Sequence, residues 1–525
     1  MSPRQCLIQL LSICLLATPA LGQLPIPAPV CPAVPADVEP RRSLFVTDLE
    51  ILQHFELEQV MNQLARQSRV PGLQAIDLWS QWWNTQNPAG PGAGPGPHCD
   101  DHVDQAGNET LNGFPYQCPR AEGGEASVDP FDPDPLNEAF YKPVALVNRF
   151  DLAPPDGANC GEYRMIFARV SGETDPLARN LIIFEAVLPN PSPGCGLEGC
   201  RKVAEFWARL SDVDDPARRA RMLARFYFRG LPRAGSAPVI RIEHFAPGTG
   251  QIRTNQFMQF NWMLREFKLA HQCTDSVPSR CSLQVVPVTD KTNPFGELFD
   301  DNSPGRRARR FQRFFLTQIP SLLPDDVNAF SNFIPNRFNT GQSQSQGNEN
   351  DYPFHLNPTG TFGTNITRVL NRLQSPLSPV HIARRSMAMS CAGCHELSTS
   401  APDNDLGPGI VWPDSLGFTH VSESSTEVLP DGTLGFMISP ALTDEFLPHR
   451  ERVFERFLRH PPCRGDDCPG IAAITSASGP GPIVVLHSDA RGEPLPFTSA
   501  EVEALDALLK QGQSRETLGG PRRSH

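Results

Sequence analysis

The sequence predicts an α+β protein, with a mixed α+β amino-terminal domain held by disulfides and a smaller, mainly α domain after it. Three observations support this fold class. The chain has 525 residues, several times the length of one typical domain, so it can bury more than one core. Its 54 prolines and 40 glycines indicate many turns and irregular connections. Strand-like and helix-like patterns also follow one another through the amino-terminal part.

The first residues have the features of a secretory signal peptide. Arg4 is followed by the apolar run CLIQLLSICLLATPALG, which is too short for a membrane span. Ala20 and Gly22 precede a suitable cleavage point before Gln23. No later apolar run approaches the ~20 residues of a transmembrane helix. We therefore expect residues 1–22 to be removed, leaving a secreted or periplasmic protein without a transmembrane segment.

The net charge of the chain limits the classes of partner that it can bind. It carries 46 basic and 58 acidic side chains, for a formal net charge of −12 at pH 7. Because like charges repel, this balance argues against nucleic acid and against anionic lipid as partners.

The cysteines indicate the same oxidising compartment. Of the 14 cysteines, Cys6 and Cys14 lie in the predicted signal, and Cys391 and Cys394 belong to a motif described below. The others are even in number and predict five disulfides. Proximity along the chain suggests the pairs Cys99–Cys118, Cys195–Cys200, Cys273–Cys281 and Cys463–Cys468, with Cys31–Cys160 left over.

Hydrophobic spacing predicts the elements of the amino-terminal domain in order. Residues 49–67 repeat apolar side chains three and four positions apart, as an amphipathic helix does, and 76–83 adds three tryptophans to the core. A Gly/Pro-rich stretch at 87–104 breaks regular structure. β-Branched and aromatic residues predict a hairpin of strands at 163–170 and 180–188. The other expected elements are helices at 203–210, 216–228 and 260–270 and a strand at 237–245.

A polar segment divides the sequence. Residues 339–353, NTGQSQSQGNENDYP, hold no aliphatic side chain, which is typical of a linker or a long loop. We expect it to separate a mixed α+β domain at 23–338 from a second domain at 354–515. Residues 516–525 are expected to be a disordered tail.

The second domain contains the pattern C-x-x-C-H at Cys391, Cys394 and His395. This pattern attaches c-type haem: both thiols add to the haem vinyl groups and the histidine binds the iron. If the segment from Pro379 is helical, both cysteines fall on the stripe that Met387 also occupies, so their thiols face one side. The adjacent imidazole can then reach the metal.

Two other readings of the motif are weaker. A zinc site would need a second pair of ligands at similar spacing, and the nearest later pair, Cys463 and Cys468, is better explained as a small disulfide loop. A thioredoxin-like dithiol would be expected in a βαβ context, which the preceding SPVHIARRSMAMS does not suggest.

Over roughly 375–512, the sequence resembles the soluble cytochrome c family, in which a helix leads into C-x-x-C-H and a Gly-Pro pair, a methionine and a closing helix follow. The resemblance implies one covalent haem c, with His395 as the proximal iron ligand. It also implies that the carbonyl of Pro408, in DLGPGIVWP, accepts a hydrogen bond from the outer nitrogen of His395. An ordinary turn without this contact is an equally good reading of Gly407-Pro408.

The same resemblance implies that Met437, in TLGFMISPAL, is the sixth ligand of the iron. His420 and His449 are the alternatives, and Met437 can also simply fill the core. Two segments qualify as the closing helix, 448–460 and 497–512. The second is favoured because Thr498 and Glu501 form a capping-box pattern.

Two polar clusters in the amino-terminal domain are candidate sites. Asn148, Arg149, Asp151, Glu162 and Arg164 can line a polar site, although a structural network of arginines and carboxylates is the favoured reading. The segment 98–102, HCDDH, can bind a divalent metal, although a solvated loop pinned by a disulfide is favoured. No hydrolase elbow, phosphate loop or dinucleotide fingerprint is present in the sequence.

These observations favour a periplasmic or secreted monohaem cytochrome that passes single electrons to a redox partner protein or a small donor or acceptor. One alternative is a haem oxidoreductase of the peroxidase or oxygenase type, in which His420 or His449 acts with Arg450 at an open iron site. Peroxidases with two haems carry two C-x-x-C-H motifs, and this chain has one. A further alternative makes the amino-terminal domain an enzyme and the haem its electron outlet.

Overall fold

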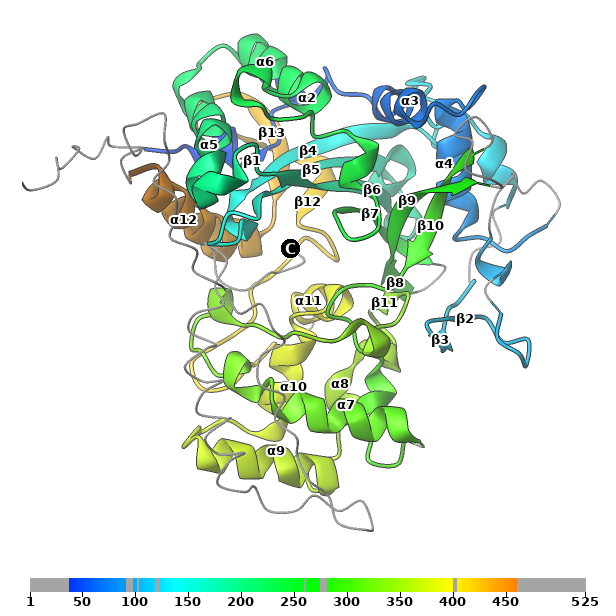
Figure 1. Ribbon diagram of the computed structural model, residues 1–525, viewed down its shortest axis with the longest axis vertical. Helices are drawn as coiled ribbons and strands as arrows, with labels where there is room; N and C mark the ends of the chain where they lie inside the picture. Colours follow the sequence, from blue (N-terminus) through cyan, green and yellow to red (C-terminus); the bar gives the residue numbers. More distant parts are fainter. Residues whose placement is uncertain are drawn as a thin grey trace, which may run out of the picture.

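A computed structural model describes residues 37–90, 98–101, 103–118, 123–258, 261–273, 281–303, 305–399 and 404–459. The protein combines one large antiparallel sheet with helices, so the predicted mixed α+β class is confirmed (Figure 1). The predicted signal peptide at 1–22, Cys463 with Cys468, the helix at 497–512 and the tail at 516–525 lie outside the described residues.

The large sheet has the order β1-β4-β5-β6-β7-β8-β11, and β9 and β10 extend it from β7. All of its pairs are antiparallel. The predicted hairpin is β5 and β6. The strands are β1 (Phe45–Val46), β4 (Tyr141–Arg149), β5 (Asn159–Arg169), β6 (Asn180–Pro189), β7 (Gln251–Met258), β8 (Asn261–Leu264), β9 (Glu266–Cys273), β10 (Cys281–Val288) and β11 (Ser343–Gln344). Two small ribbons are β2 (Thr110–Leu111) with β3 (Phe114–Pro115), and β12 (Val421–Val428) with β13 (Leu434–Ile438).

Helices cover the sheet and build the lower part of the molecule in Figure 1. The α-helices are α1 (Pro40–Ser43), α2 (Leu49–Leu52), α3 (Leu57–Ser68), α4 (Ala75–Asn84), α5 (Arg201–Ala208), α6 (Pro216–Arg229), α7 (Arg306–Leu316), α8 (Tyr352–His355), α9 (Thr361–Arg372), α10 (Pro379–Met387), α11 (Cys391–Leu397) and α12 (Leu447–Arg459). The predicted helices at 203–210 and 216–228 are α5 and α6, and the three tryptophans of α4 are buried as expected.

The two faces of the sheet differ in polarity because successive side chains on a strand point to opposite sides. On one face, Tyr163 of β5 packs against Trp207 of α5 and Phe226 of α6, with ring centroids 5.7 and 5.1 Å away. On the other face, Arg164 and Ile166 line a cavity described below. One face is therefore core, and the other carries the candidate site.

Three sequence expectations about local structure are wrong. The predicted helix at 49–67 is broken into α2 and α3, and the break places Phe55 against Tyr227 and Phe228 of α6. The predicted helix at 260–270 is instead β8 and β9, because pairing with β7 and β10 outweighs helical spacing in so short a segment.

The predicted strand at 237–245 does not join the sheet. Pro238 has no N–H to donate, and the N–H groups of Val239 and Ile240 bond to carbonyls of Phe226 and Tyr227 near the end of α6. These bonds use the backbone groups that a strand would need.

The polar segment 339–353 is largely buried. It supplies β11 to the sheet, and Thr340, Gln342, Ser343 and Asn350 are each 0% exposed. The side-chain amides of Asn293 and Asn350 form hydrogen bonds of 2.6 to 3.3 Å with buried polar groups of this segment and with each other. A single cluster of buried apolar residues also runs from Val38 to Phe457, so it includes residues on both sides of this segment.

Two disulfides are present among the described residues, Cys99–Cys118 and Cys160–Cys200. The first was predicted. The second shows that two predicted pairs, Cys195–Cys200 and Cys31–Cys160, are wrong. Cys195 is also disulfide-bonded, to a cysteine other than Cys200. The physical reason is the fold of the loop after β6, which brings Cys200 beside the start of β5, 40 residues earlier. Cys273 and Cys281 occupy opposite positions of the β9–β10 pair.

The Cys160–Cys200 bridge gives a first prediction. Non-reducing peptide mapping should find these two cysteines in one linked peptide pair, and Cys200→Ala should lower the free energy of unfolding by about 4 kcal/mol, since the bridge closes a 40-residue loop. Recovery of a Cys195–Cys200 peptide from the native protein would contradict the arrangement.

The carboxyl of Glu349, in the polar segment, gives a pH prediction. Burial raises its pKa to about 7, against an opposing hydrogen bond from Gln342. Between pH 4.5 and 7 the native state therefore holds a proton that the unfolded chain has lost, so stability falls as pH rises, by about 3 kcal/mol in total. Glu349→Gln should remove this contribution to the loss of stability, and urea unfolding at pH 4.5 and at pH 7 would measure it.

The control for this experiment is Glu445→Gln, which changes an exposed carboxylate that is not among the charges acting on Glu349. It should keep the pH profile of the wild type. If the free energy of unfolding depends on pH in the same way in the wild type and in Glu349→Gln, Glu349 is ionised over the whole range from pH 4.5 to 7.

Candidate functional site

The C-x-x-C-H motif forms a short helix of its own. The expected helix from Pro379 is present as α10, but it ends at Met387, and α11 starts at Cys391 after a turn. Ser390 caps the new helix, since its hydroxyl accepts a 3.1 Å hydrogen bond from the N–H of Gly393. The two cysteines therefore lie on a separate turn of helix. Their side chains do not continue the row of side chains that runs along α10 to Met387.

Contacts from three other segments fix α11. The N–H of Ala392 donates a 2.8 Å hydrogen bond to the Ser343 hydroxyl of β11, so the polar segment holds the motif directly. The indole N–H of Trp412 donates to the carbonyl of Cys394 at 3.1 Å. Gly393 is required for the close turn, because a Cβ there would collide with the carbonyl oxygen of Met387.

Both cysteines and the histidine are buried. Cys391, Cys394 and His395 are 1%, 0% and 5% exposed, and neither cysteine forms a disulfide. The ring of Trp262 lies 4.7 Å from that of His395, centroid to centroid. Trp262 is held in turn by a 2.6 Å hydrogen bond from its indole N–H to Asn255, so the sheet fixes the imidazole orientation.

His420 is the second imidazole of the site. Its ring centroid lies 4.8 Å from that of His395, and its Nε2 lies 3.8 Å from the sulfur of Cys394. Its other nitrogen, Nδ1, is 2.8 Å from the hydroxyl of Ser439. Such a bond on one ring nitrogen sets the orientation of a histidine whose other nitrogen binds a metal.

The protonation states of both histidines suit metal binding. Burial lowers the pKa of His395 well below its ordinary value, and the nearby His420 adds to the effect. Burial lowers the pKa of His420 to about 3, with a contribution from the charge of Arg450. Both rings are therefore neutral at pH 7, which is the form that donates an electron pair to a metal.

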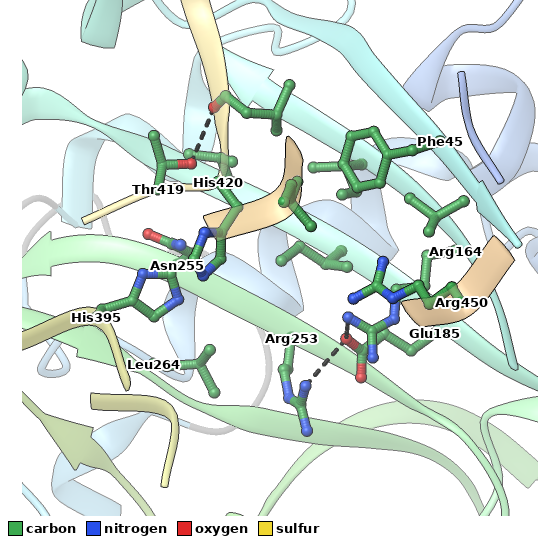
Figure 2. A pocket seen from close by; sticks show the side chains of 16 residues that line it. Phe45, Arg164, Glu185, Arg253, Asn255, Leu264, His395, Thr419, His420 and Arg450 are labelled. Carbon is green, nitrogen blue, oxygen red and sulfur yellow. Dashed lines mark hydrogen bonds and ion pairs between the residues drawn. The ribbon is translucent and has the colours of Figure 1, made fainter. Parts of the chain in front are cut away.

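These histidines line a cavity with a volume of about 70 Å³ (Figure 2). This volume holds a few water molecules, so an organic ligand would require the walls to move apart. Much of the wall is apolar, and the cavity is lined by Phe45, Val147, Arg164, Ile166, Leu181, Ile183, Glu185, Arg253, Asn255, Leu264, His395, Thr419, His420, Val421, Leu442 and Arg450.

Strand register explains why these residues meet. Val147 pairs with Arg164, Arg164 with Glu185, and Ile183 with Arg253 across β4, β5, β6 and β7. Alternation along each strand places every second residue on the same face. One face of four neighbouring strands thus makes the floor of the cavity, while α11, α12 and the segment around His420 close it.

The structure does not bring Met437 or His449 to this cavity. Met437 is half-buried on β13, between the buried side chains of Phe436 and Ile438, which point the other way. His449 is half-buried on α12, and its charge helps to lower the pKa of the Asp151 carboxyl. Of the three proposed sixth ligands, His420 alone lines the cavity.

Pro408 is exposed in a turn. The preceding Gly407 lies against Leu377, His381 and Arg385 of the segment that forms α10, so the Gly-Pro turn packs on that helix.

The predicted arginine and carboxylate cluster divides into two parts. Arg149 holds Asp151 through contacts of 2.9 to 3.2 Å, as a structural pair does. Arg164 pairs with Glu162 at 2.6 Å and with Glu185 at 3.2 Å, and it faces the cavity. In the HCDDH loop, Asp100 and Asp101 accept backbone hydrogen bonds from Ala89 and His98, as residues of a turn do.

Sequence reasoning missed Glu185 and Arg253, which extend this network. A sequence signal was available for Glu185 only, because in NLIIFEAVL this glutamate interrupts an apolar strand pattern, which indicates a charge on a buried face. Only pairing between distant strands shows that these charges meet Arg164.

Comparison with protein-family models, with curated protein sequences and with solved structures finds no match to this chain. Within the described ranges, no group of three or more His, Cys, Asp or Glu side chains has the arrangement of a metal site. No helix in the described part of the chain has the length and hydropathy of a membrane span.

Proposed function

We propose that this protein is a monohaem c-type cytochrome of the periplasm or extracellular space, which transfers single electrons to a redox partner. The observation that carries the proposal is the position of the motif: Cys391, Cys394 and His395 lie on one short helix, and His395 lines a cavity.

The residues around the cavity suit haem, and its walls would have to move apart to admit the ring, since its volume is about 70 Å³. A porphyrin is a flat, apolar ring with two acidic side chains, and it needs an apolar wall, a neutral imidazole and cations for the acids. Ile166, Ile183 and Leu264 are part of the apolar wall, and Arg164, Arg253 and Arg450 supply cations. Cys394 adjoins the cavity through its contact with His420, whereas Cys391 packs with Phe257, Trp262 and Leu264 at its edge.

Bound haem supplies an iron ion that takes up and releases one electron. In this chain, His395 offers a neutral imidazole whose plane is set by Trp262. The apolar walls would exclude water from the metal and so tune its reduction potential. Cys391 and Cys394 would hold the ring covalently.

His420 is the residue best placed to be the sixth ligand, in preference to Met437. It lines the cavity, faces His395 and has its Nδ1 held by Ser439. Imidazoles from both His395 and His420 would hold the iron and leave no position for an external ligand, which would suit electron transfer.

A haem oxidoreductase is the second candidate function, because His420 and Arg450 both line the cavity. There, His420 would stay off the iron and move protons, and Arg450 would stabilise negative charge on a substrate. The two functions differ in whether the sixth position accepts an external ligand.

The primary prediction concerns haem attachment. The protein expressed in a host that matures c-type cytochromes should be coloured after denaturing extraction, and its mass should include one haem. Cys391→Ala/Cys394→Ala should lose the covalent pigment, because both thioether bonds are removed. Met437→Ala, which leaves the motif intact, is the control. A colourless wild-type protein would end the proposal.

The second prediction identifies the sixth ligand. The reduced wild-type protein should not bind carbon monoxide, whereas His420→Ala should bind it, and the absorption spectrum measures both. Met437→Ala should have the wild-type spectrum, since its side chain lies outside the cavity. Loss of the wild-type axial spectrum in Met437→Ala alone would favour methionine, and carbon monoxide binding by the wild type would favour the oxidoreductase.

A further inference from the structure

One amide side chain joins the two walls that carry the histidines of the site. Asn255 lies on β7, is 5% exposed and lines the cavity. Its Oδ1 accepts a 2.6 Å hydrogen bond from the indole N–H of Trp262, and its Nδ2 donates a 3.3 Å hydrogen bond to the backbone carbonyl of Phe418. Figure 2 shows this amide at the same end of the cavity as the rings of His395 and His420.

The two partners of Asn255 set a chemical requirement at this position. An indole N–H only donates a hydrogen bond and a backbone carbonyl only accepts one, so the side chain between them must offer both an acceptor and a donor. An asparagine amide offers both. A leucine of similar size offers neither, and an aspartate carboxylate offers only the acceptor. Size alone therefore does not meet the requirement.

On one side, the bond to Asn255 fixes the plane of Trp262. This side chain is buried, and a buried indole N–H that loses its acceptor costs free energy. The ring centroid of Trp262 lies 4.7 Å from that of His395, with 37° between the two planes. A rotation of the indole would therefore push against the imidazole, so Asn255 acts on His395 through Trp262.

On the other side, the bond to Asn255 holds an unusual turn. Gly417 and Phe418 both have left-handed backbone angles, with φ of 55° and 66°. Phenylalanine adopts such angles rarely, because its Cβ crowds the backbone there, so other contacts must hold the turn. Two of these contacts are the bond from Asn255 to the Phe418 carbonyl and the ring of Trp262, whose centroid lies 6.2 Å from that of Phe418. His420 follows two residues later, so the turn sets where this histidine enters the cavity.

From this geometry we infer that Asn255 is a positioning residue, which keeps the imidazole of His420 next to that of His395. It acts on His395 through Trp262 and on His420 through the carbonyl of Phe418. The inference rests on the proposed function in one respect, since an iron bound by His395 is the group that His420 would be kept within reach of. The two hydrogen bonds do not involve the iron, so they are testable whether or not the protein carries haem.

The test compares Asn255→Leu with a matched control, Asn148→Leu, in the purified protein. Asn148 is 0% exposed on β4 of the same sheet and does not line the cavity. Its side chain donates a 3.1 Å hydrogen bond to the carbonyl of Ser43 and accepts one of 2.9 Å from the N–H of Phe150. Each variant thus loses one donated and one accepted bond, but only Asn255→Leu loses them beside the histidines.

If the protein carries haem, its reduced form should bind carbon monoxide at least about tenfold faster in Asn255→Leu than in the wild type, because His420 leaves the iron more readily. Asn148→Leu should keep the wild-type behaviour. An unchanged rate in Asn255→Leu, or the same increase in both variants, would overturn the inference and leave the cytochrome in place.

If the protein carries no haem, the cytochrome is refuted, and hydrogen–deuterium exchange tests Asn255 by itself. The backbone amides of residues 414–422, followed by mass spectrometry, should exchange about tenfold faster in Asn255→Leu and at the wild-type rate in Asn148→Leu. An unchanged rate in Asn255→Leu, or an equal increase in both variants, counts against the inference.

A second variant covers the case in which Asn255→Leu does not fold. Asn255→Asp at pH 8 has nearly the same shape, and its carboxylate accepts the indole bond but cannot donate to the carbonyl of Phe418. The same increases are expected from it in either experiment, and wild-type rates would again overturn the inference.

Discussion

The candidate site depends on the antiparallel register of β4, β5, β6 and β7. Because side chains alternate along a strand, this register sends Tyr163 into the core beneath α5 and α6 and sends Arg164 to the opposite face. A slip of one residue would exchange the two. It would bury guanidinium groups among aromatic rings and expose the rings to the cavity, so the hydrophobic packing of one face fixes the charges of the other.

The sheet also positions the C-x-x-C-H motif, although the two are far apart in the sequence. β11 brings Ser343 to the N–H of Ala392, and β8 brings Trp262 to the ring of His395. The polar segment at 339–353 is therefore structural. Its side chains lack aliphatic surface because they satisfy one another and the backbone by hydrogen bonds in a buried position, which costs little when every group is paired.

Much of the local structure could be predicted from the sequence. The hairpin of β5 and β6, the helices α5, α6 and α10, the buried tryptophans of α4 and the Cys99–Cys118 disulfide follow from patterns within short stretches. The strands at 260–270 could not be predicted, because a partner strand decides between two structures that short apolar runs allow equally. Cys160–Cys200 could not be predicted either, since chain proximity favoured a different neighbour.

The sequence by itself determined the chemical hypothesis, because two cysteines and a histidine in the pattern C-x-x-C-H are the attachment pattern of c-type haem. Only the tertiary structure decided which other residues lie near His395. It brings His420 to the cavity and leaves Met437 and His449 outside it, and it gathers Arg164, Arg253 and Arg450 from three elements. The reason is physical: a ligand set and a charge cluster are properties of distance in space, which strand pairing and helix packing set and which spacing along the chain does not encode.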